Sequence, residues 1–239
     1  MKKALVTGGS GGIGTAVCRR LSADGCHVYV HANRGLQTAQ SLVEEIKAAG
    51  GSAEALCFDV TDQAAVEAAL LPLIEDEPIQ IVVNNAGIHD DAVFPGMTAE
   101  QWRSVIDVSV NGFFNVTHPL MMPMIRSRWG RIINVSSISA ITGNRGQVNY
   151  SAAKGALNSA TKALAQEVAS RGITVNAVAP GIIETSMSES TFPAEEIARM
   201  VPMKRAGTPT EVADLIGFLA SEQAAYISGQ IISINGAMI

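Results

Sequence analysis

The feature that most constrains the fold of this chain is a glycine-rich segment between an apolar run and an amphipathic stretch. Residues 4–6 are apolar, residues 7–14 read TGGSGGIG, and the amphipathic stretch follows directly. Glycine permits positive φ and lets a backbone approach a pyrophosphate closely. The N-terminus of a following helix directs free N–H groups and a positive dipole at such an anion. A flexible turn would explain the glycines alone, but strand, glycines and helix in this order predict a dinucleotide-binding unit.

The alternation of strand and helix patterns continues along the chain. Further strands are predicted at residues 27–31, 53–58, 79–83, 131–135, 173–178 and 231–234, and a helix at 36–49. The apolar run at 79–83 fits a central parallel strand buried on both faces. Two helices are expected between 98 and 128, the second containing Pro119 and Pro123, which would kink or end it. We predict a single domain over residues 1–239, built on a doubly wound parallel sheet of about seven strands with helices on both faces.

Composition limits the classes of protein to which the chain can belong. With 239 residues, 47% hydrophobic and 16% charged, it suits a buried sheet covered by helices rather than a disordered chain. A net charge of -5 gives no overall attraction for nucleic acid, and no apolar run approaches the roughly 18 residues needed to cross a bilayer. We expect a cytoplasmic protein without a metal site, because its four histidines show no ligand spacing. Cys18, Cys26 and Cys57 are expected to be buried, reduced thiols.

A second constellation lies between residues 137 and 154. In a helix, Tyr150 and Lys154 would lie on one face, one turn apart. An ammonium near a phenol lowers the phenol pKa from about 10 towards neutrality, which makes tyrosine a usable acid or base. Ser137 follows a predicted strand, where its hydroxyl could hydrogen-bond a substrate oxygen. A surface tyrosine and lysine on an alanine-rich helix is the alternative, and the glycine-rich N-terminus favours the catalytic interpretation.

These motifs together resemble a known family. TGxxxGxG at 7–14, NNAG at 84–87, Ser137, YxxxK at 150–154 and PG at 180–181 occur in the order seen in short-chain dehydrogenases/reductases. The resemblance covers essentially the whole chain and implies a Rossmann-type fold. Two segments, EVASRGITVNAVAPGIIET and FLASEQAAYISGQIISINGAM, are similar to bacterial 3-oxoacyl-[acyl-carrier-protein] reductases.

That resemblance implies NADPH-dependent reduction of a 3-oxoacyl thioester on acyl carrier protein, in fatty-acid or polyketide-like synthesis. Tyr150 would give a proton to the carbonyl oxygen, Lys154 would hold the nicotinamide ribose hydroxyls and lower the tyrosine pKa, and Ser137 would polarise the carbonyl. One alternative is a reductase or dehydrogenase of a free small ketone, alcohol or sugar. Another is a non-catalytic assembly partner, against which the intact catalytic residues argue.

One position departs from the family pattern. Counting from Trp102, the catalytic asparagine of the relatives aligns with Ser109. Asn111 lies two residues on, about 200° around a helix, and should face elsewhere. In relatives this asparagine helps to hold a local helix distortion, and a main-chain carbonyl there binds the water that links the lysine to solvent. Serine keeps that carbonyl, and its hydroxyl can bond locally to the backbone.

The end of the second predicted strand bears on the choice of cofactor. An acid there would grip the adenosine ribose of NAD, but the sequence is His31-Ala32-Asn33-Arg34. A guanidinium pairs well with the 2′-phosphate of NADP, so we predict NADPH; a solvated loop arginine is the alternative. Many NADP-using relatives have a basic residue where this chain has Gly11.

The family arrangement implies cofactor contacts from the loops that follow the strands. Asp59 would accept from the adenine amino group, or alternatively cap a helix near Thr61 and Asp62. Asn84 would brace the strands. The implied cofactor-binding residues are Gly8, Ser10, Gly11, Gly12, Ile13, Gly14, Asn33, Arg34, Asp59, Val60, Asn85, Ala86, Gly87, Tyr150, Lys154, Pro180, Gly181, Ile183 and Thr185.

The resemblance also implies partners. Relatives form homotetramers and dock an acidic acyl carrier protein on arginines that match Arg128 and Arg171, a patch that Arg126 and Arg131 could enlarge. A solvated Arg171 paired with Glu167 at i, i+4 spacing is the alternative. Residues 186–205 are expected to form a lid over the substrate, or else an ordinary surface loop with one short helix.

Overall fold

The computed structural model describes residues 1–185 and 193–239, and within them the chain forms one parallel sheet. The seven strands are ordered β3-β2-β1-β4-β5-β6-β7. They are β1 (Lys3–Val6), β2 (His27–Ala32), β3 (Ser52–Cys57), β4 (Ile81–Asn84), β5 (Gly130–Val135), β6 (Ile173–Pro180) and β7 (Ile231–Ile234). Because the order reverses between β1 and β4, the sheet is doubly wound, which confirms the predicted fold.

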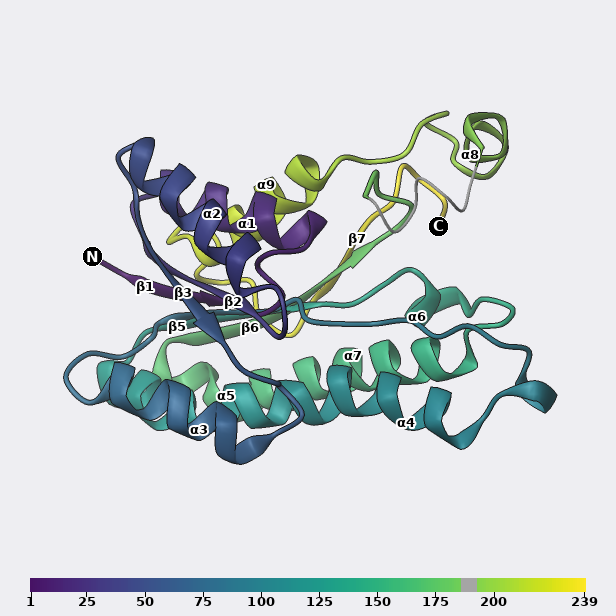
Figure 1. Ribbon diagram of the computed structural model, residues 1–239. Helices are drawn as coiled ribbons and strands as arrows, with labels where there is room; N and C mark the ends of the chain where they lie inside the picture. The colour runs from purple at the N-terminus through teal and green to yellow at the C-terminus, as the bar shows by residue number, and fades with distance from the viewer. Residues whose placement is uncertain (186–192) are drawn as a thin grey trace.

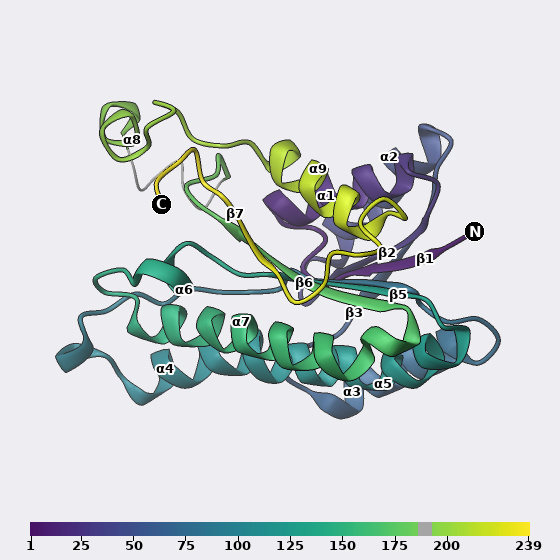
Figure 2. The same cartoon turned by 180° about the vertical axis from the view of Figure 1, so that it is seen from behind.

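Helices cover both faces of the sheet (Figure 1). One layer contains α1 (Gly12–Ala23), α2 (Leu36–Ala48) and α9 (Pro209–Ala220). The other contains α3 (Gln63–Leu70), α4 (Ala99–Ile106), α5 (Gly112–Ser127) and α7 (Val148–Val168). Short α6 (Ser139–Thr142) and α8 (Ala194–Met200) lie beyond the carboxyl ends of the strands, as the reverse view in Figure 2 also shows.

The core lies between the sheet and its two helical layers. Successive side chains of a strand point to opposite faces. In β1, Ala4 and Val6 therefore pack with the buried residues of α1, α2 and α9, whereas Leu5 packs with those of α3, α5 and α7. No helix of the described residues is long and apolar enough to span a membrane.

Local sequence explains where several helices begin. At α9, Thr208 Oγ1 accepts from Glu211 N at 3.2 Å and the Glu211 carboxylate accepts from Thr208 N at 2.8 Å, with Pro209 at the first helical position. Thr98 and Gln101 form the same reciprocal cap at α4. Each such cap contributes roughly 0.5–2 kcal/mol.

The two prolines of α5 do not end it. The helix contains Pro119 and Pro123 and continues to Ser127, after which Arg128 turns left-handed with φ 52°. An interior proline costs about 3 kcal/mol, and burial of the apolar face of α5 on the sheet offsets that cost. Between α4 and α5 the chain forms a widened π-helical turn (Asp107–Asn111) rather than a loop.

One further expectation is wrong, and another concerns residues that are only partly described. Cys18 and Cys26 are buried as predicted, but Cys57 is exposed, because it ends β3, the edge strand of the sheet. The expected lid lies partly outside the described residues; its described part contains α8.

Candidate active site

The glycine-rich turn connects β1 to α1 and has a geometry that requires glycine at two positions. Gly8 has φ +62°, and a Cβ on Gly14 would overlap the carbonyl oxygen of Gly8. Gly11 N donates to that same carbonyl at 3.1 Å and closes the turn. Within the described chain, the amides of Gly12, Ile13 and Gly14 donate to no protein group. These amides, at a helix N-terminus with an exposed entrance, could hold a diphosphate.

The NNAG segment follows β4 and fixes this turn from the other side. Asn85 Nδ2 donates to Thr7 O at 2.9 Å and to Gly8 O at 3.0 Å. The backbone amides of Asn85 and Ala86 also donate to Thr7 Oγ1, each at 3.0 Å, so side chain and backbone of this segment together hold the turn. Asn84 donates to Asn134 of β5 at 2.9 Å, so the prediction that it braces the strands is confirmed.

The segment after β6 closes the opposite side of the turn. Pro180 ends the strand, Gly181 follows it, and Ile183 is buried. A Cβ on Gly12 would lie 2.8 Å from Thr185 Cγ2, so the threonine packs against the N-terminus of α1. The structure thus brings together the predicted contacts from the first and sixth strands.

Asn33 and Arg34 are exposed after β2, beside Asp59 at the end of β3. Asp59 Oδ1 accepts from Thr61 N at 2.9 Å and Thr61 Oγ1 at 2.8 Å. These bonds lower the pKa of Asp59, with help from the Asn33 amide and the Arg34 charge. Asp59 is not the helix cap: Asp62 caps α3 by accepting from its third residue, because only Asp62 immediately precedes the helix.

Two further predicted contacts flank this end of the site. The Ser10 hydroxyl lies near Gly35, just beyond Arg34, so it faces the start of α2. Val60 is buried, and its carbonyl accepts from Asn115 Nδ2 of α5 at 2.9 Å.

Ser137, Tyr150 and Lys154 meet at the carboxyl ends of β4 and β5. The Ser137 hydroxyl is hydrogen-bonded to the Tyr150 phenol. Lys154 Nζ lies 5.7 Å from the centroid of the Tyr150 ring and donates to Val135 O at 2.9 Å. A Cβ on Gly87 would lie 2.9 Å from that ammonium, so glycine makes room for it.

Anchoring at the start of α7 orients the tyrosine. Asn149 Nδ2 donates to Asp90 O at 2.9 Å and to Gln101 O at 3.0 Å, while its Oδ1 accepts from Tyr150 N at 2.8 Å. This buried amide ties the first turn of α7 to the loop after β4 and to α4. The phenol therefore sits on a rigid element.

The pKa shifts in this cluster differ from the expectation. Burial lowers the pKa of Lys154 to about 8. Burial also raises the pKa of Tyr150; the Ser137 hydrogen bond opposes that rise and the Asp91 charge adds to it. The expected fall of the tyrosine pKa towards neutrality is therefore wrong in this structure, because desolvation of the phenol outweighs the contacts that favour its ionised form.

Ser109 lies at the middle of the π-helical turn. It is buried, and its hydroxyl has no hydrogen-bond partner among the described residues. Together with Thr7 and Asn84 it borders a cavity of about 10 Å³, room for about one water molecule. Asn111 is exposed and donates to Asp107 Oδ1 at 2.7 Å, so it faces away from the site.

Comparison with known proteins identifies the family. Residues 2–196 match the family model described as short chain dehydrogenase. The chain belongs to the short-chain dehydrogenase family. It is accordingly an oxidoreductase that acts on a ketone or an alcohol with a nicotinamide cofactor.

Relatives in this family match nearly the whole chain. A 3-oxoacyl-[acyl-carrier-protein] reductase FabG of Aggregatibacter actinomycetemcomitans is 43% identical, over 98% of this chain and 98% of its own. A 3-oxoacyl-[acyl-carrier-protein] reductase of Synechocystis is 43% identical over 99% of this chain and 96% of its own. Nodulation protein G of Azospirillum brasilense is 41% identical over 99% and 98%.

The predicted docking arginines lie away from this dehydrogenase site. Arg128 and Arg171 are exposed. Arg128 Nη2 donates to Ser170 O at 3.2 Å, so the chain around Arg128 adjoins the chain around Arg171. No ion pair joins Arg171 to Glu167 among the described residues. The arginines precede β5 and β6, whereas Tyr150 lies at the carboxyl edge.

Arg131 does not enlarge that arginine patch. Its side chain is 2% exposed, and its Nη2 lies 3.4 Å from Glu222 Oε2. Its guanidinium carbon lies 4.2 Å from the centroid of the Trp129 ring. The expectation failed because its partner Glu222 lies far away in sequence, after α9.

The sequence interpretation also missed three residues that shape the site. Asn149 anchors the tyrosine helix, Asp91 adds negative charge near the phenol, and buried His31 bonds the glycine turn. An acid after NNAG and a histidine at the end of a buried strand were visible signals. Neither stands at a spacing that marks a known motif.

Proposed function

We propose that this protein is a cytoplasmic, NADPH-dependent reductase of 3-oxoacyl thioesters carried on acyl carrier protein. The observation that carries the proposal is that Ser137, Tyr150 and Lys154 lie together beside the glycine turn. Relatives named as 3-oxoacyl-[acyl-carrier-protein] reductases support the substrate class. A reductase of a free small ketone, alcohol or sugar is the second candidate, because the name nodulation protein G specifies no substrate.

The residues fit a dinucleotide cofactor. The turn offers amides at the N-terminus of α1 that have no partner among the described residues, and the end of β2 offers Arg34 with no acid in the His31-Ala32-Asn33-Arg34 segment. The cofactor, when bound, supplies the hydride that adds to the carbonyl carbon.

This chain's own residues manage the proton. Tyr150 has a raised pKa, is therefore protonated at neutral pH and gives its proton to the carbonyl oxygen. Ser137, already bonded to the phenol, polarises the same oxygen. Lys154, with a pKa of about 8, is mostly charged at pH 7 and stabilises the phenolate that remains. The negative charge thus passes from the reduced carbonyl oxygen to a phenolate between a hydroxyl and an ammonium.

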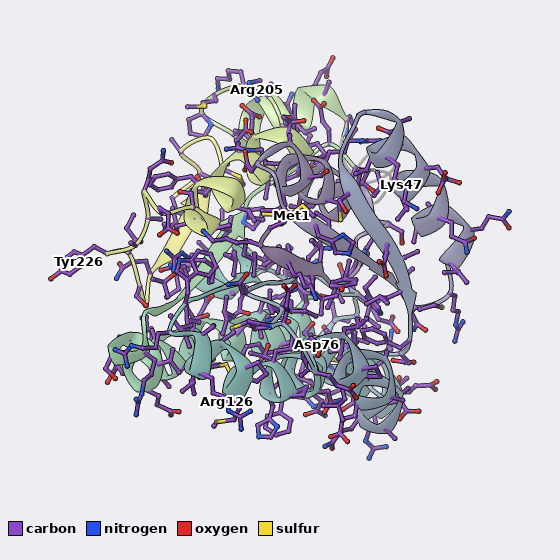
Figure 3. All side chains as sticks on the ribbon, turned by 90° about the vertical axis from the view of Figure 1, so that its left-hand side faces the viewer. Met1, Lys47, Asp76, Arg126, Arg205 and Tyr226 are labelled. Atoms are coloured by element: carbon purple, nitrogen blue, oxygen red, sulfur yellow. The ribbon has the colours of Figure 1, made fainter. Side chains whose placement is uncertain are left out.

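The NADPH assignment is tested at Arg34. Arg34→Ala should weaken the binding of NADPH by roughly 1.5–3 kcal/mol, because a hydrogen bond to a charged group is lost, and should leave the binding of NADH nearly unchanged. Arg126→Ala is the matched control, since this exposed arginine projects from the α5 layer on the other face of the sheet (Figure 3). Equal kcat/KM of the wild type for NADPH and NADH would refute the assignment.

Carrier docking at Arg128 and Arg171 has a structural consequence. The eight residues of β6 span about 25 Å, so a carrier at its start is far from the site at its end. We therefore extend the proposal to a homotetramer in which a carrier docked on one copy serves the site of a neighbouring copy.

Turnover measurements separate the candidate functions. Loss of NADPH absorbance should be fastest with a 3-oxoacyl thioester on acyl carrier protein, slower with a short soluble thioester and slowest with free ketones or sugars. Preference for a free ketone would favour the second candidate. Absence of turnover on every carbonyl compound would favour a non-catalytic assembly partner.

A further inference from the structure

A buried histidine holds the glycine-rich turn in place. His31 lies on β2 with 1% of its surface exposed. Its Nδ1 lies 3.0 Å from Gly8 N, and its Nε2 lies 2.9 Å from Phe58 O. A backbone N–H can only donate and a carbonyl can only accept, so the ring is neutral, with its proton on Nε2 and a lone pair on Nδ1.

Two clamps hold the turn from both neighbours of β1. On the β2 side, the His31 ring accepts from Gly8 N and the His31 carbonyl accepts from Gly9 N at 2.8 Å. On the β4 side, Asn85 donates to the carbonyl of Gly8 at 3.0 Å. Gly8 has φ +62°, and among the described residues the imidazole is the only acceptor of its amide hydrogen. Loss of that acceptor would free the first glycine of the turn.

The same ring reaches the adenosine side of the site. Its Nε2–H bonds the carbonyl of Phe58, and the two rings pack with centroids 4.1 Å apart. Phe58 directly precedes Asp59 and Val60. One side chain therefore connects the turn proposed for the diphosphate with the segment proposed for the adenine.

We propose that His31 is a positioning residue for the dinucleotide: its neutral imidazole fixes the turn, and its protonation loosens the turn and weakens cofactor binding in acid. The inference rests on the proposed function, in which this turn binds NADPH. A protonated ring carries N–H on both nitrogens, so Nδ1 would face Gly8 N–H donor to donor.

The charges around the ring set the pH at which this happens. Burial lowers the pKa of His31; the Phe58 carbonyl and the Asp59 carboxylate oppose that shift. Arg34 acts on Asp59 from the end of β2, and the Cys18 thiol of α1, beside Gly9, stays neutral because burial raises its pKa. A lowered pKa keeps the ring neutral at pH 7, so binding is intact there and is lost only as the pH falls below the ordinary histidine range.

Two substitutions separate the two bonds of the ring. His31→Asn keeps a side-chain oxygen near the place of Nδ1, which can accept from Gly8, whereas His31→Gln places its amide nearer Nε2 and can serve only Phe58. Neither side chain titrates. His27→Gln is the control, because His27 lies on the same strand but bonds Ser52 Oγ at 2.7 Å.

The test measures the Kd of NADP⁺ by calorimetry from pH 5 to 8, with circular dichroism to verify folding. At pH 7.5, H31Q should bind at least tenfold more weakly than the wild type and H31N within about threefold. Between pH 7.5 and 5, the wild type and H27Q should lose affinity at least fivefold more than H31N does.

Each variant gives a result that either supports or contradicts the role of His31. If H31Q fails to fold, the acid loss of the wild type against H31N still tests the inference. Equal acid loss in H31N and the wild type, or wild-type affinity in a folded H31Q, would overturn it while leaving the proposed function intact. A wild type with no affinity for NADP⁺ or NAD⁺ at any pH would overturn both.

Discussion

The buried ammonium of Lys154 should make this protein more stable in alkaline solution. The side chain is fully enclosed, its amine donates to Val135 O at 2.9 Å, and burial lowers its pKa from 10.5 to about 8. A pKa lowered by that much corresponds to about 3 kcal/mol against the charged form in the folded state. The buried charge therefore lowers the stability of the folded protein, at a site where a charged lysine stabilises the tyrosinate.

The direction of the effect follows from proton linkage. Between pH 8 and 10.5 the unfolded chain holds the lysine proton more firmly than the folded chain does. The free energy of unfolding therefore rises with pH in that window, and this lysine contributes about 2.5 kcal/mol of the rise between pH 7 and 10. Lys154→Met should remove the contribution.

Urea unfolding at pH 7 and pH 10 measures the contribution of Lys154 to the free energy of unfolding. At pH 7, Lys154→Met should gain about 3 kcal/mol of unfolding free energy over the wild type, because no ammonium is buried. It should also lose roughly 1–3 kcal/mol, because the carbonyl of Val135 then has no partner. At pH 10 that advantage should shrink or reverse. Lys162→Met, an exposed change about two turns along α7, should follow the wild type. Parallel pH dependence in Lys154→Met and the wild type would refute the reasoning.

Three further predictions concern the site and its partners. Asp91→Asn removes a charge that raises the phenol pKa, so the alkaline limit of the kcat profile for carbonyl reduction should move to lower pH; an unchanged limit would contradict this. Ser109→Asn should change kcat by less than about tenfold, and Asn111→Ala should matter little; collapse of a folded Asn111→Ala would show that the wrong residue was aligned. Charge reversal at Arg128 and Arg171 should raise KM for a carrier-bound substrate, as added salt should, but not for a short thioester; equal loss on both would disprove docking there.

Local rules predicted the parts of this site that depend on the backbone. The turn at 7–14 is set by positive φ and close approach, both visible as glycine in the sequence. The spacing of Tyr150 and Lys154 needs only a helix, and α7 provides it. Asn84 followed an apolar strand and was correctly expected to brace its neighbours, because a polar side chain there is buried and must find a partner.

Tertiary packing decided the rest. Arg131 has the sequence surroundings of a surface arginine, yet Trp129 and Glu222 bury it from two directions. Cys57 has apolar neighbours, but it ends a strand with a partner on only one side. The pKa of Tyr150 depends on how much water its phenol loses, and no spacing in the sequence measures that loss.

The widened turn around Ser109 forms without a hydrogen bond from the side chain at its centre to the described chain. Other contacts hold it: the amide of Asn111 spans the turn to the Asp107 carboxylate, and Gly112 fits so closely that a Cβ would lie 2.9 Å from Val60. The contacts that hold this turn therefore come from Asn111 and from Gly112 of α5 against Val60, which follows β3, and not from the side chain that faces the cavity.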